Sequence, residues 1–338
     1  MLDLAIIGCG QIGSRHLQSL ALMDERATIH LVDPSPESLA LCEARFAEVL
    51  SPWKKETFSM VLHEKCDKLP PDLDAAIVAS GSMHRAQLCC SLLKASRPRF
   101  LLLEKFLFPR VADYAHVENL LLENLIPSHV NQWLSTTPSF HKILSNLGIE
   151  TDLVNRSIKQ HGPVHMRVWG AGWGLCCNAV HYLEPFSILT SGGQVTLQKT
   201  DFKHGFAQSK RPGYREIFGR MKFSAPDGSS LELECTDDPP SDWIGIDIEH
   251  QSNRASARFY LDRFECNFQI AGTTWSETLP IPRQSEYTHL ILEKFFQTGK
   301  CALPDLATSS RQHLLVLNPF LDHFRKSDPS VCETCPIT

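Results

Sequence analysis

The sequence predicts an α/β fold in two domains: a doubly wound parallel sheet, then an α+β domain with a large, mostly antiparallel open sheet. Three observations predict it. The chain has 338 residues, about twice the length of one typical domain. Short apolar runs alternate with helical patterns over about the first 130 residues, and alternating apolar–polar strands dominate the rest. The expected domains are therefore 1–130 and 131–338.

The first half alternates between strands and helices. Leu4 begins a continuous apolar run that ends at Gly8, which is typical of a strand buried on both faces. Ser35 followed by Pro36 predicts the N-cap and first position of a helix. Strands are expected at 4–7, 29–32, 75–79, 100–103 and 128–131, and helices at 11–23, from 36 onward, 86–95 and 111–124. Strands joined by helical crossovers form a parallel sheet.

The second half is expected to form the open sheet. Its strands alternate apolar with polar residues, and turn residues such as Asp227 and Gly228 separate them. Strands are expected at 164–168, 195–199, 221–223, 231–234, 244–249, 257–261, 264–270 and 274–279, and helices at 286–297 and 309–324. Pro319 is expected to bend or break the last helix. A sheet with one exposed face also predicts a homo-oligomer, a dimer or tetramer, formed through it.

Composition excludes several classes of protein. Apolar residues make up 43% and charged residues 21%, as in globular domains rather than disordered chains. A net charge of −5 and a pI near 6.3 argue against nucleic acid or a membrane surface as the main partner. The apolar runs are far shorter than a membrane span, and no signal peptide is recognisable. A cytoplasmic location is therefore expected.

The 12 cysteines do not predict a disulfide framework. Several lie within apolar stretches, as Cys42 does, which suits buried thiols in a reducing compartment. Cys332 and Cys335 form a Cys-x-x-Cys pair, but no second close pair accompanies it to complete a zinc site. We therefore expect no metal, and an unstructured tail around these thiols.

Charge is unevenly spread in the second half. Residues 203–222 hold six Lys or Arg and one Glu, whereas 227–249 hold eight Asp or Glu and no Lys or Arg. One interpretation is that these segments are solvated faces. A second is that Arg211 or Arg215 binds a phosphate or carboxylate of the substrate. A third is that the basic and acidic segments pair between subunits.

The most informative motif is a glycine turn, Gly-x-Gly-x-x-Gly, between a buried-type strand and a helix. Gly8 permits the tight turn, Gly10 lets a pyrophosphate approach the backbone, and Gly13 lets helix and strand pack closely. The helix N-terminus offers its N–H groups to phosphate. Asp33 ends the next strand, where a carboxylate binds ribose hydroxyls and repels a 2′-phosphate. NAD is therefore expected, and NADP less so, with cofactor contacts from Gly8, Gly10, Gln11, Ile12, Gly13 and Asp33.

Further features follow the turn in a fixed order along the chain. They are His16 after the last glycine, Ser80 and His84 after the strand at 75–79, Glu104 and Lys105 after the strand at 100–103, and His181 with Glu184 opening a helix beyond a glycine-rich stretch. Together they resemble the glucose–fructose oxidoreductase/inositol dehydrogenase (Gfo/Idh/MocA) family over nearly the whole chain. The resemblance implies a Rossmann domain, and hydride transfer between NAD(P) and a ring hydroxyl of a sugar, cyclitol or nucleotide sugar. It also places Ser80, His84 and Glu104 on the cofactor side.

Two positions depart from the family pattern. The family's Glu-Lys-Pro is here Glu104-Lys105-Phe106, and without proline the bond after Lys105 is expected to be trans, because a non-proline cis bond costs about 2.5–4 kcal/mol. The first acid of the family's helix motif is replaced by Cys177. The segment 177–182 is similar to family branches associated with bacterial surface-sugar biosynthesis.

Oxidising an alcohol needs a base for the O–H proton and a cation for the developing alkoxide. The resemblance implies that His181 is the base and Lys105 the cation. Asn178 shares a helix face with His181 and is a candidate substrate contact. Asn131 ends the last strand of the first domain and is a candidate contact to the substrate or to the nicotinamide pocket. Trp173 either stacks on a sugar face or packs in the core. A core or capping role for His181 also stays open.

Three functions fit this reading. The first is an NAD-dependent dehydrogenase of a sugar, cyclitol or nucleotide sugar. The second is a redox-silent NAD-binding sensor or scaffold, suggested by the replacements at Cys177 and Phe106. The third is an NAD-dependent glycosidase, which would release no net NADH.

Overall fold

The computed structural model describes residues 1–54, 56–152, 157–159, 162–190 and 194–338. The chain forms two compact units. The first consists of Met1–Asn131 and Pro282–Ser310, and the second of Gln132–Ile281 and Arg311–Thr338. Each unit is therefore built from two separate stretches of chain.

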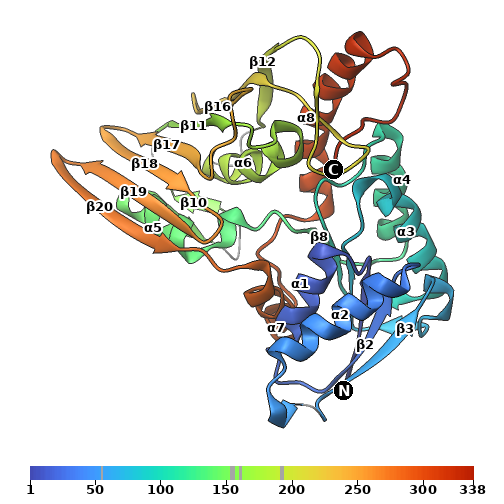
Figure 1. Cartoon of the computed structure of the whole chain (residues 1–338). Coiled ribbons are helices and arrows are strands. Elements are labelled where there is room, and N and C mark those ends of the chain that lie inside the picture. The colour runs from blue at the N-terminus through green and yellow to red at the C-terminus, as the bar shows by residue number, and fades with distance from the viewer. Residues whose placement is uncertain (55, 153–156, 160–161, 191–193) are drawn as a thin grey trace. The chain divides into compact units, whose positions relative to one another are not determined.

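The first unit is a six-stranded parallel sheet in the order β3-β2-β1-β5-β7-β8. Its strands are β1 (Leu2–Ile7), β2 (Ala27–Val32), β3 (Phe58–His63), β5 (Ala75–Val78), β7 (Leu101–Leu103) and β8 (Ser128–Val130). The chain moves outward from the centre in both directions, so right-handed crossovers put helices on both faces. The helices are α1 (Gln11–Leu20), α2 (Pro36–Val49), α3 (Ser82–Ala95) and α4 (Val111–Glu123) (Figure 1). The doubly wound parallel sheet is confirmed, with its switch point between β1 and β5.

Burial explains which strands the sequence revealed. The central strands β5 and β7 are buried at every residue and gave continuous apolar runs. Strand β3 was not expected, because it lies at the sheet edge, its side chains are half-buried or exposed, and such a run is missing. Ser35 caps α2 as expected, since its side chain accepts from Ser38 N at 3.1 Å. Short strands β4 (Asp72–Leu73) and β6 (Arg97–Pro98) pair beside this sheet, and α7 (Thr288–Thr298) belongs to the returning segment and contacts α1.

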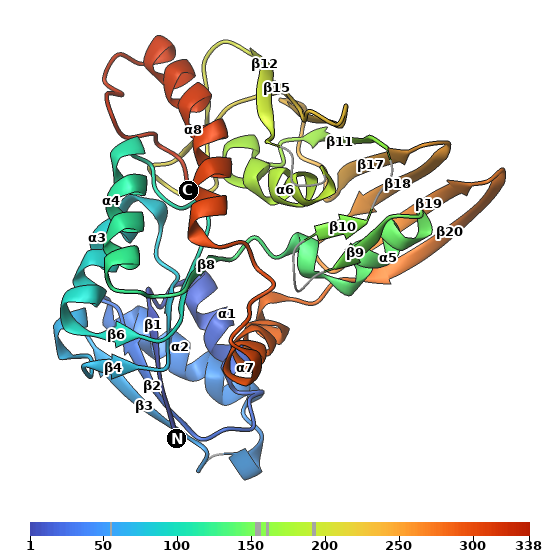
Figure 2. The same cartoon turned by 180° about the vertical axis from the view of Figure 1, so that it is seen from behind.

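The second unit is an eight-stranded sheet in the order β12-β15-β16-β11-β17-β18-β19-β20. Its strands are β11 (Val164–Ala171), β12 (Thr196–Phe202), β15 (Gly219–Ser224), β16 (Ser230–Thr236), β17 (Ile244–His250), β18 (Asn253–Phe259), β19 (Arg263–Ile270) and β20 (Thr273–Pro280). Only β11 and β16 pair in parallel among these described strands, so the mostly antiparallel open sheet is confirmed. Helices α5 (Pro138–Asn146) and α6 (Leu175–Leu189) pack on it, as Figure 2 shows. Shorter strands are β9 (Glu150–Asp152), β10 (Ser157–Lys159), β13 (Ala207–Gln208) and β14 (Arg215–Glu216).

Two expectations for the second half are corrected. Helix α8 (Leu306–Ser327) continues unbroken through Pro319, because a proline removes only one backbone donor and the buried neighbours Phe320 and Phe324 hold the helix in place. The C-terminal tail is not unstructured, since Cys335 and Ile337 are fully buried. The carbonyl of Pro336 also accepts from Arg215 N at 2.7 Å.

The basic and acidic segments pair within this one chain, across β15 and β16. Arg220 lies 2.6 Å from Glu234, and Lys222 lies 2.8 Å from Glu232. Glu234 also bonds Arg167, on β11, at 2.7 Å. Among the residues that the structure describes, no helix has the length and hydropathy to span a membrane.

Candidate functional site

The glycine turn at the carboxyl end of β1 has the geometry that a dinucleotide site requires. Gly8 has a φ of +94°, and a Cβ there would lie 2.6 Å from Ser80 N. A Cβ at Gly13 would lie 1.9 Å from the carbonyl oxygen of Gly8. A Cβ at Gly10 would meet nothing within 4 Å. Gly8 and Gly13 are therefore needed for the turn, whereas Gly10 leaves an open approach to the backbone at the N-terminus of α1, which fits a pyrophosphate.

Asp33 lies against this turn. Its Oδ2 accepts from Cys9 N at 2.8 Å and its Oδ1 from Ser35 N at 2.9 Å. These bonds fix the carboxylate at the end of β2, beside the turn. The arrangement fits the ribose of a bound dinucleotide, and its preference for NAD over NADP stays a prediction.

Arg45 on α2 was not predicted. It donates to Ser14 Oγ at 2.5 Å and to Gln11 Oε1 at 2.8 Å, so a cation lies at the first turn of α1. The motif could not reveal it, because Arg45 comes from the following helix. Of the two helix positions predicted to bind the cofactor, Gln11 is exposed and Ile12 half-buried.

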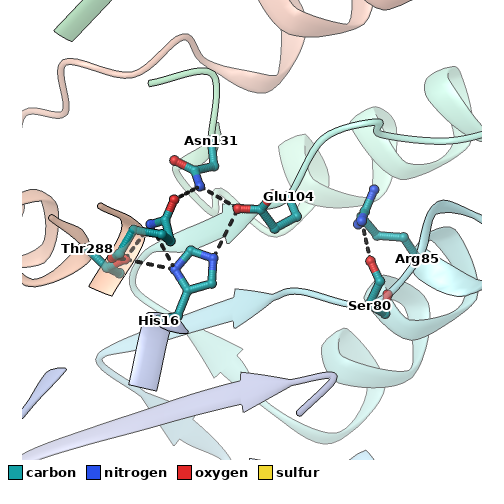
Figure 3. A network of polar contacts seen from close by, with 7 residues as sticks. His16, Ser80, Arg85, Glu104, Asn131 and Thr288 are labelled. Carbon is teal, nitrogen blue, oxygen red and sulfur yellow. Dashed lines mark hydrogen bonds and ion pairs between the residues drawn. The ribbon is translucent and has the colours of Figure 1, made fainter. Parts of the chain in front are cut away.

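The ends of β5 and β7 are joined by Arg85, which is 2% exposed. Its guanidinium donates to the carbonyls of Ser80 and Phe106, and to that of Leu107 at 3.0 Å. Arg85 lies on the buried face of α3, together with Cys89 one helical turn later. In the sequence this shared face was visible only as a spacing of four residues. Figure 3 shows Arg85 reaching Ser80.

The peptide bond between Lys105 and Phe106 is cis, so the expected trans bond is wrong. The expectation rested on the average cost for a non-proline residue, while here Phe106 is fully buried and its carbonyl is held by Arg85. Ser80 is half-buried in the loop between β5 and α3, and His84 is exposed on α3.

Five buried or half-buried side chains of the first unit form one polar network (Figure 3). His16 Nε2 lies 3.0 Å from Glu104 Oε1, and His16 Nδ1 lies 2.8 Å from Thr288 Oγ1. Asn131 Nδ2 donates to Glu104 Oε1 and, at 2.8 Å, to Gln284 Oε1. Gln284 Nε2 donates to Thr288 Oγ1 at 2.7 Å. Gln284 and Thr288 were missed, because nothing in the sequence connects them to motifs more than 150 residues away.

Glu104 is buried in this network and stays ionised. Burial raises its pKa, but hydrogen bonds from His16 and Asn131, with the charges of His16 and Lys105, outweigh this and set the pKa at about 2. Lys105 itself is half-buried and directly follows Glu104. Both oxygens of the carboxylate can therefore only accept, which fixes the partners around it.

In the second unit, α6 presents one half-buried face made by Cys177, Asn178 and His181, while most of the helix is buried. The shared face predicted for Asn178 and His181 fits this pattern. Asn178 Nδ2 donates to the carbonyl of Trp173 at 2.7 Å. The helix α6 continues through Pro185 without a break.

Other predicted residues of this unit take part in packing. Trp173 is 9% exposed, donates from Nε1 to the Glu234 carbonyl at 2.8 Å, and meets the ring of Tyr182 edge-on. Glu184 is fully buried. Arg215 bonds Asp328 at 2.7 Å and Arg211 bonds Thr338 at 3.2 Å, so both contact the C-terminal part of the chain. Within the described ranges no cluster of His, Cys, Asp and Glu suits a metal ion.

The chain is similar to known proteins in sequence over its first part and in fold over almost its full length. Residues 2–125 match a family described as "Oxidoreductase family, NAD-binding Rossmann fold". No curated protein matches the chain by sequence. Solved structures match over almost the full length and show the same fold.

Three of these structures illustrate the likeness. UDP-N-acetylglucosamine 3-dehydrogenase from Acidithiobacillus ferrooxidans is 13% identical, with a TM-score of 0.68 over 94% of this chain and 96% of that one. A 3-ketoreductase from Actinomadura kijaniata, in complex with TDP-benzene and NADP, is 13% identical, with a TM-score of 0.66 over 93% and 95%. An oxidoreductase from Vibrio cholerae is 14% identical, with a TM-score of 0.68 over 96% and 99%.

Proposed function

We propose that the chain, whose residues 2–125 match the Gfo/Idh/MocA model of NAD-binding oxidoreductases, transfers a hydride between NAD and a ring hydroxyl of a sugar, cyclitol or nucleotide sugar. One observation carries the proposal. The open backbone at Gly10, the carboxylate of Asp33 and the residue Lys105 all follow the carboxyl ends of parallel strands of one sheet, where ligands bind in such folds. Two solved structures of the same fold are described as a nucleotide-sugar dehydrogenase and a 3-ketoreductase bound to TDP-benzene, which supports a nucleotide-sugar substrate.

The residues divide the chemistry as follows. The glycine turn and Asp33 hold the dinucleotide, which supplies the hydride acceptor when bound. His181 takes the proton from the substrate hydroxyl, and Lys105 stabilises the negative charge that develops on the same oxygen. Ser80 and His84 are proposed to contact the cofactor, and Asn178 to contact the substrate. Trp173 is a weaker candidate for substrate contact, because its ring and N–H are both engaged in packing.

The test follows reduced-nicotinamide absorbance in the purified protein with NAD and a panel of free sugars, cyclitols and nucleotide sugars. We expect turnover with at least one of them. Lys105→Ala and His181→Ala should each lower kcat by roughly 10²–10⁴-fold while NAD affinity stays within a few-fold. Lys94→Ala and His204→Ala, at exposed positions of the same two units, serve as matched controls and should keep full activity.

Tight NAD binding without turnover on any substrate would favour the redox-silent sensor instead. Cleavage of a glycoside without net NADH would favour the glycosidase. Association of the chain through the outer face of the second unit's sheet is part of the proposal, and a monomeric mass by light scattering would contradict it.

A further inference from the structure

The carbonyl oxygen of Asn131 is the starting point of a further inference. Asn131 directly follows β8 and is 2% exposed. Its Oδ1 is buried, and no residue that the structure describes donates a hydrogen bond to it. Buried polar atoms nearly always have a partner, so this acceptor requires an explanation.

The orientation of this amide is determined by its neighbours. Nδ2 donates to two oxygens, Glu104 Oε1 and Gln284 Oε1. Glu104 is a carboxylate and can only accept, so the amide cannot be turned over without facing oxygen against oxygen. Figure 3 shows the amide nitrogen of Asn131 towards Glu104 and its oxygen directed away from it. The acceptor oxygen of Asn131 therefore points away from the network.

The position of Asn131 identifies the donor. The sheet changes direction between β1 and β5, and a dinucleotide crosses a doubly wound sheet at that point. Asp33 follows β2 on one side, which is the adenosine side. Asn131 and Lys105 follow β8 and β7 on the other, which is the nicotinamide side. All the partners of the Asn131 amide belong to the first unit, the unit that holds the glycine turn.

We propose, on the basis of the function proposed above, that Asn131 Oδ1 accepts a hydrogen bond from the carboxamide N–H of the nicotinamide, and that Glu104 and Gln284 are positioning residues that aim this oxygen. Glu104 thus acts on the cofactor through Asn131 rather than by touching it. Glu104, directly before Lys105, and Gln284, in the segment that follows the second unit's sheet, therefore both contribute to orienting the cofactor.

The test compares binding of NAD with binding of its 3-acetylpyridine analogue, in which a methyl group replaces the carboxamide amine. Calorimetric titration of the wild-type protein should give about 3- to 10-fold weaker binding of the analogue, the usual net effect of one hydrogen bond. This arm needs no variant and therefore no assumption about folding. Equal affinity for the two dinucleotides would overturn the proposal.

Variants then assign the effect to the network. Asn131→Ala should bind NAD as weakly as the analogue, so the discrimination disappears. Glu104→Gln can donate as well as accept, so it should lose part of the discrimination. Asn124→Ala, whose side chain bonds the Leu120 carbonyl in the same unit, is the matched control and should discriminate as the wild type does.

The remaining outcomes are also decisive. If Asn131→Ala discriminates as the wild type does and only raises the KM for the sugar, Asn131 binds a substrate hydroxyl and the proposal is wrong. If neither dinucleotide binds to the wild-type protein, the proposed function itself fails. Circular dichroism of each variant confirms that it is folded.

Discussion

At the scale of single residues, the glycine turn separates two roles that one motif combines. Gly13 is required by the fold, since a Cβ there would overlap the Gly8 carbonyl, whereas a Cβ at Gly10 would contact no protein atom. The motif assigns packing to Gly13 and phosphate approach to Gly10, and these contacts agree with that division. The structure predicts that they fail differently when replaced.

We expect Gly13→Ala to destabilise the protein by more than about 1–3 kcal/mol, because the methyl group meets backbone that cannot move aside. Gly10→Ala should leave Tm nearly unchanged and weaken NAD binding at least about tenfold, because its methyl group blocks the approach to the helix N-terminus. Thermal denaturation and calorimetric titration measure the two effects. A fall in Tm for Gly10→Ala as large as for Gly13→Ala would contradict this division.

Glu104 predicts a pH dependence of stability. Its pKa in the folded protein, about 2, lies below its ordinary value of 4.5, so its stabilising contribution is complete above pH 4.5 and is lost as pH falls towards 2. The full shift corresponds to about 3 kcal/mol. Urea denaturation should therefore show the stability difference between wild type and Glu104→Gln shrinking as pH falls below 4.5.

The exposed Glu123→Gln serves as the control, and its difference from wild type should stay small at every pH. A gap between wild type and Glu104→Gln that stays constant on acidification would mean that Glu104 is not held ionised by its neighbours.

At the scale of elements, the C-terminal tail behaves as a structural element although it contains no helix or strand. Its buried side chains, Cys335 and Ile337, fill space in the second unit, and its backbone bonds Arg215 on β14. Composition could not reveal this, because a tail that contains polar residues and a proline has no periodic pattern.

Ile337→Ala should lower the free energy of unfolding by about 2–5 kcal/mol, and Ile337→Val by about 0.5–1.5 kcal/mol, as expected for buried aliphatic side chains. Cys332→Ser, at an exposed position of the same tail, should change it little. Chemical denaturation measures all three. If Ile337→Ala is as stable as Cys332→Ser, the tail does not pack as described.

At the scale of the whole molecule, the chain returns to its first unit after completing the second unit's sheet. In the returning segment, Thr288 forms a hydrogen bond with His16, and Gln284 accepts one from Asn131. The carbonyl of Pro304 also accepts from Val130 N at 3.0 Å. A fragment that ends at Asn131 therefore lacks part of the first unit.

A fragment of residues 1–131 should melt at a lower temperature and with less cooperativity than the same fragment joined to 282–310. A short Gly/Ser linker can join them, because Asn131 contacts Gln284 directly. The fused protein should bind NAD. Circular dichroism and calorimetry provide the comparison, and equal melting of the two proteins would show that the returning segment is dispensable.

Sequence reasoning could predict the features that depend on local patterns, in both units. The strand–turn–helix around Gly8 to Gly13, Asp33 and the half-exposed face of α6 follow from local patterns, and the structure contains all of them. The edge strand β3 and the unbroken α8 did not follow, because exposure at a sheet edge hides an apolar run and packing can hold a helix through a proline.

The sequence by itself determined the alternation of strands and helices in the first unit, the glycine turn and the acidic residue after β2, because each depends on neighbours a few residues apart. Only the tertiary structure decided that Glu104 is held by His16 and Asn131, that Arg85 bonds the Phe106 carbonyl, and that Gln284 orients Asn131. These contacts join segments that lie far apart in the chain. Hydrogen bonds are directional and local in space, so residues distant in sequence form them only when the completed fold brings them together.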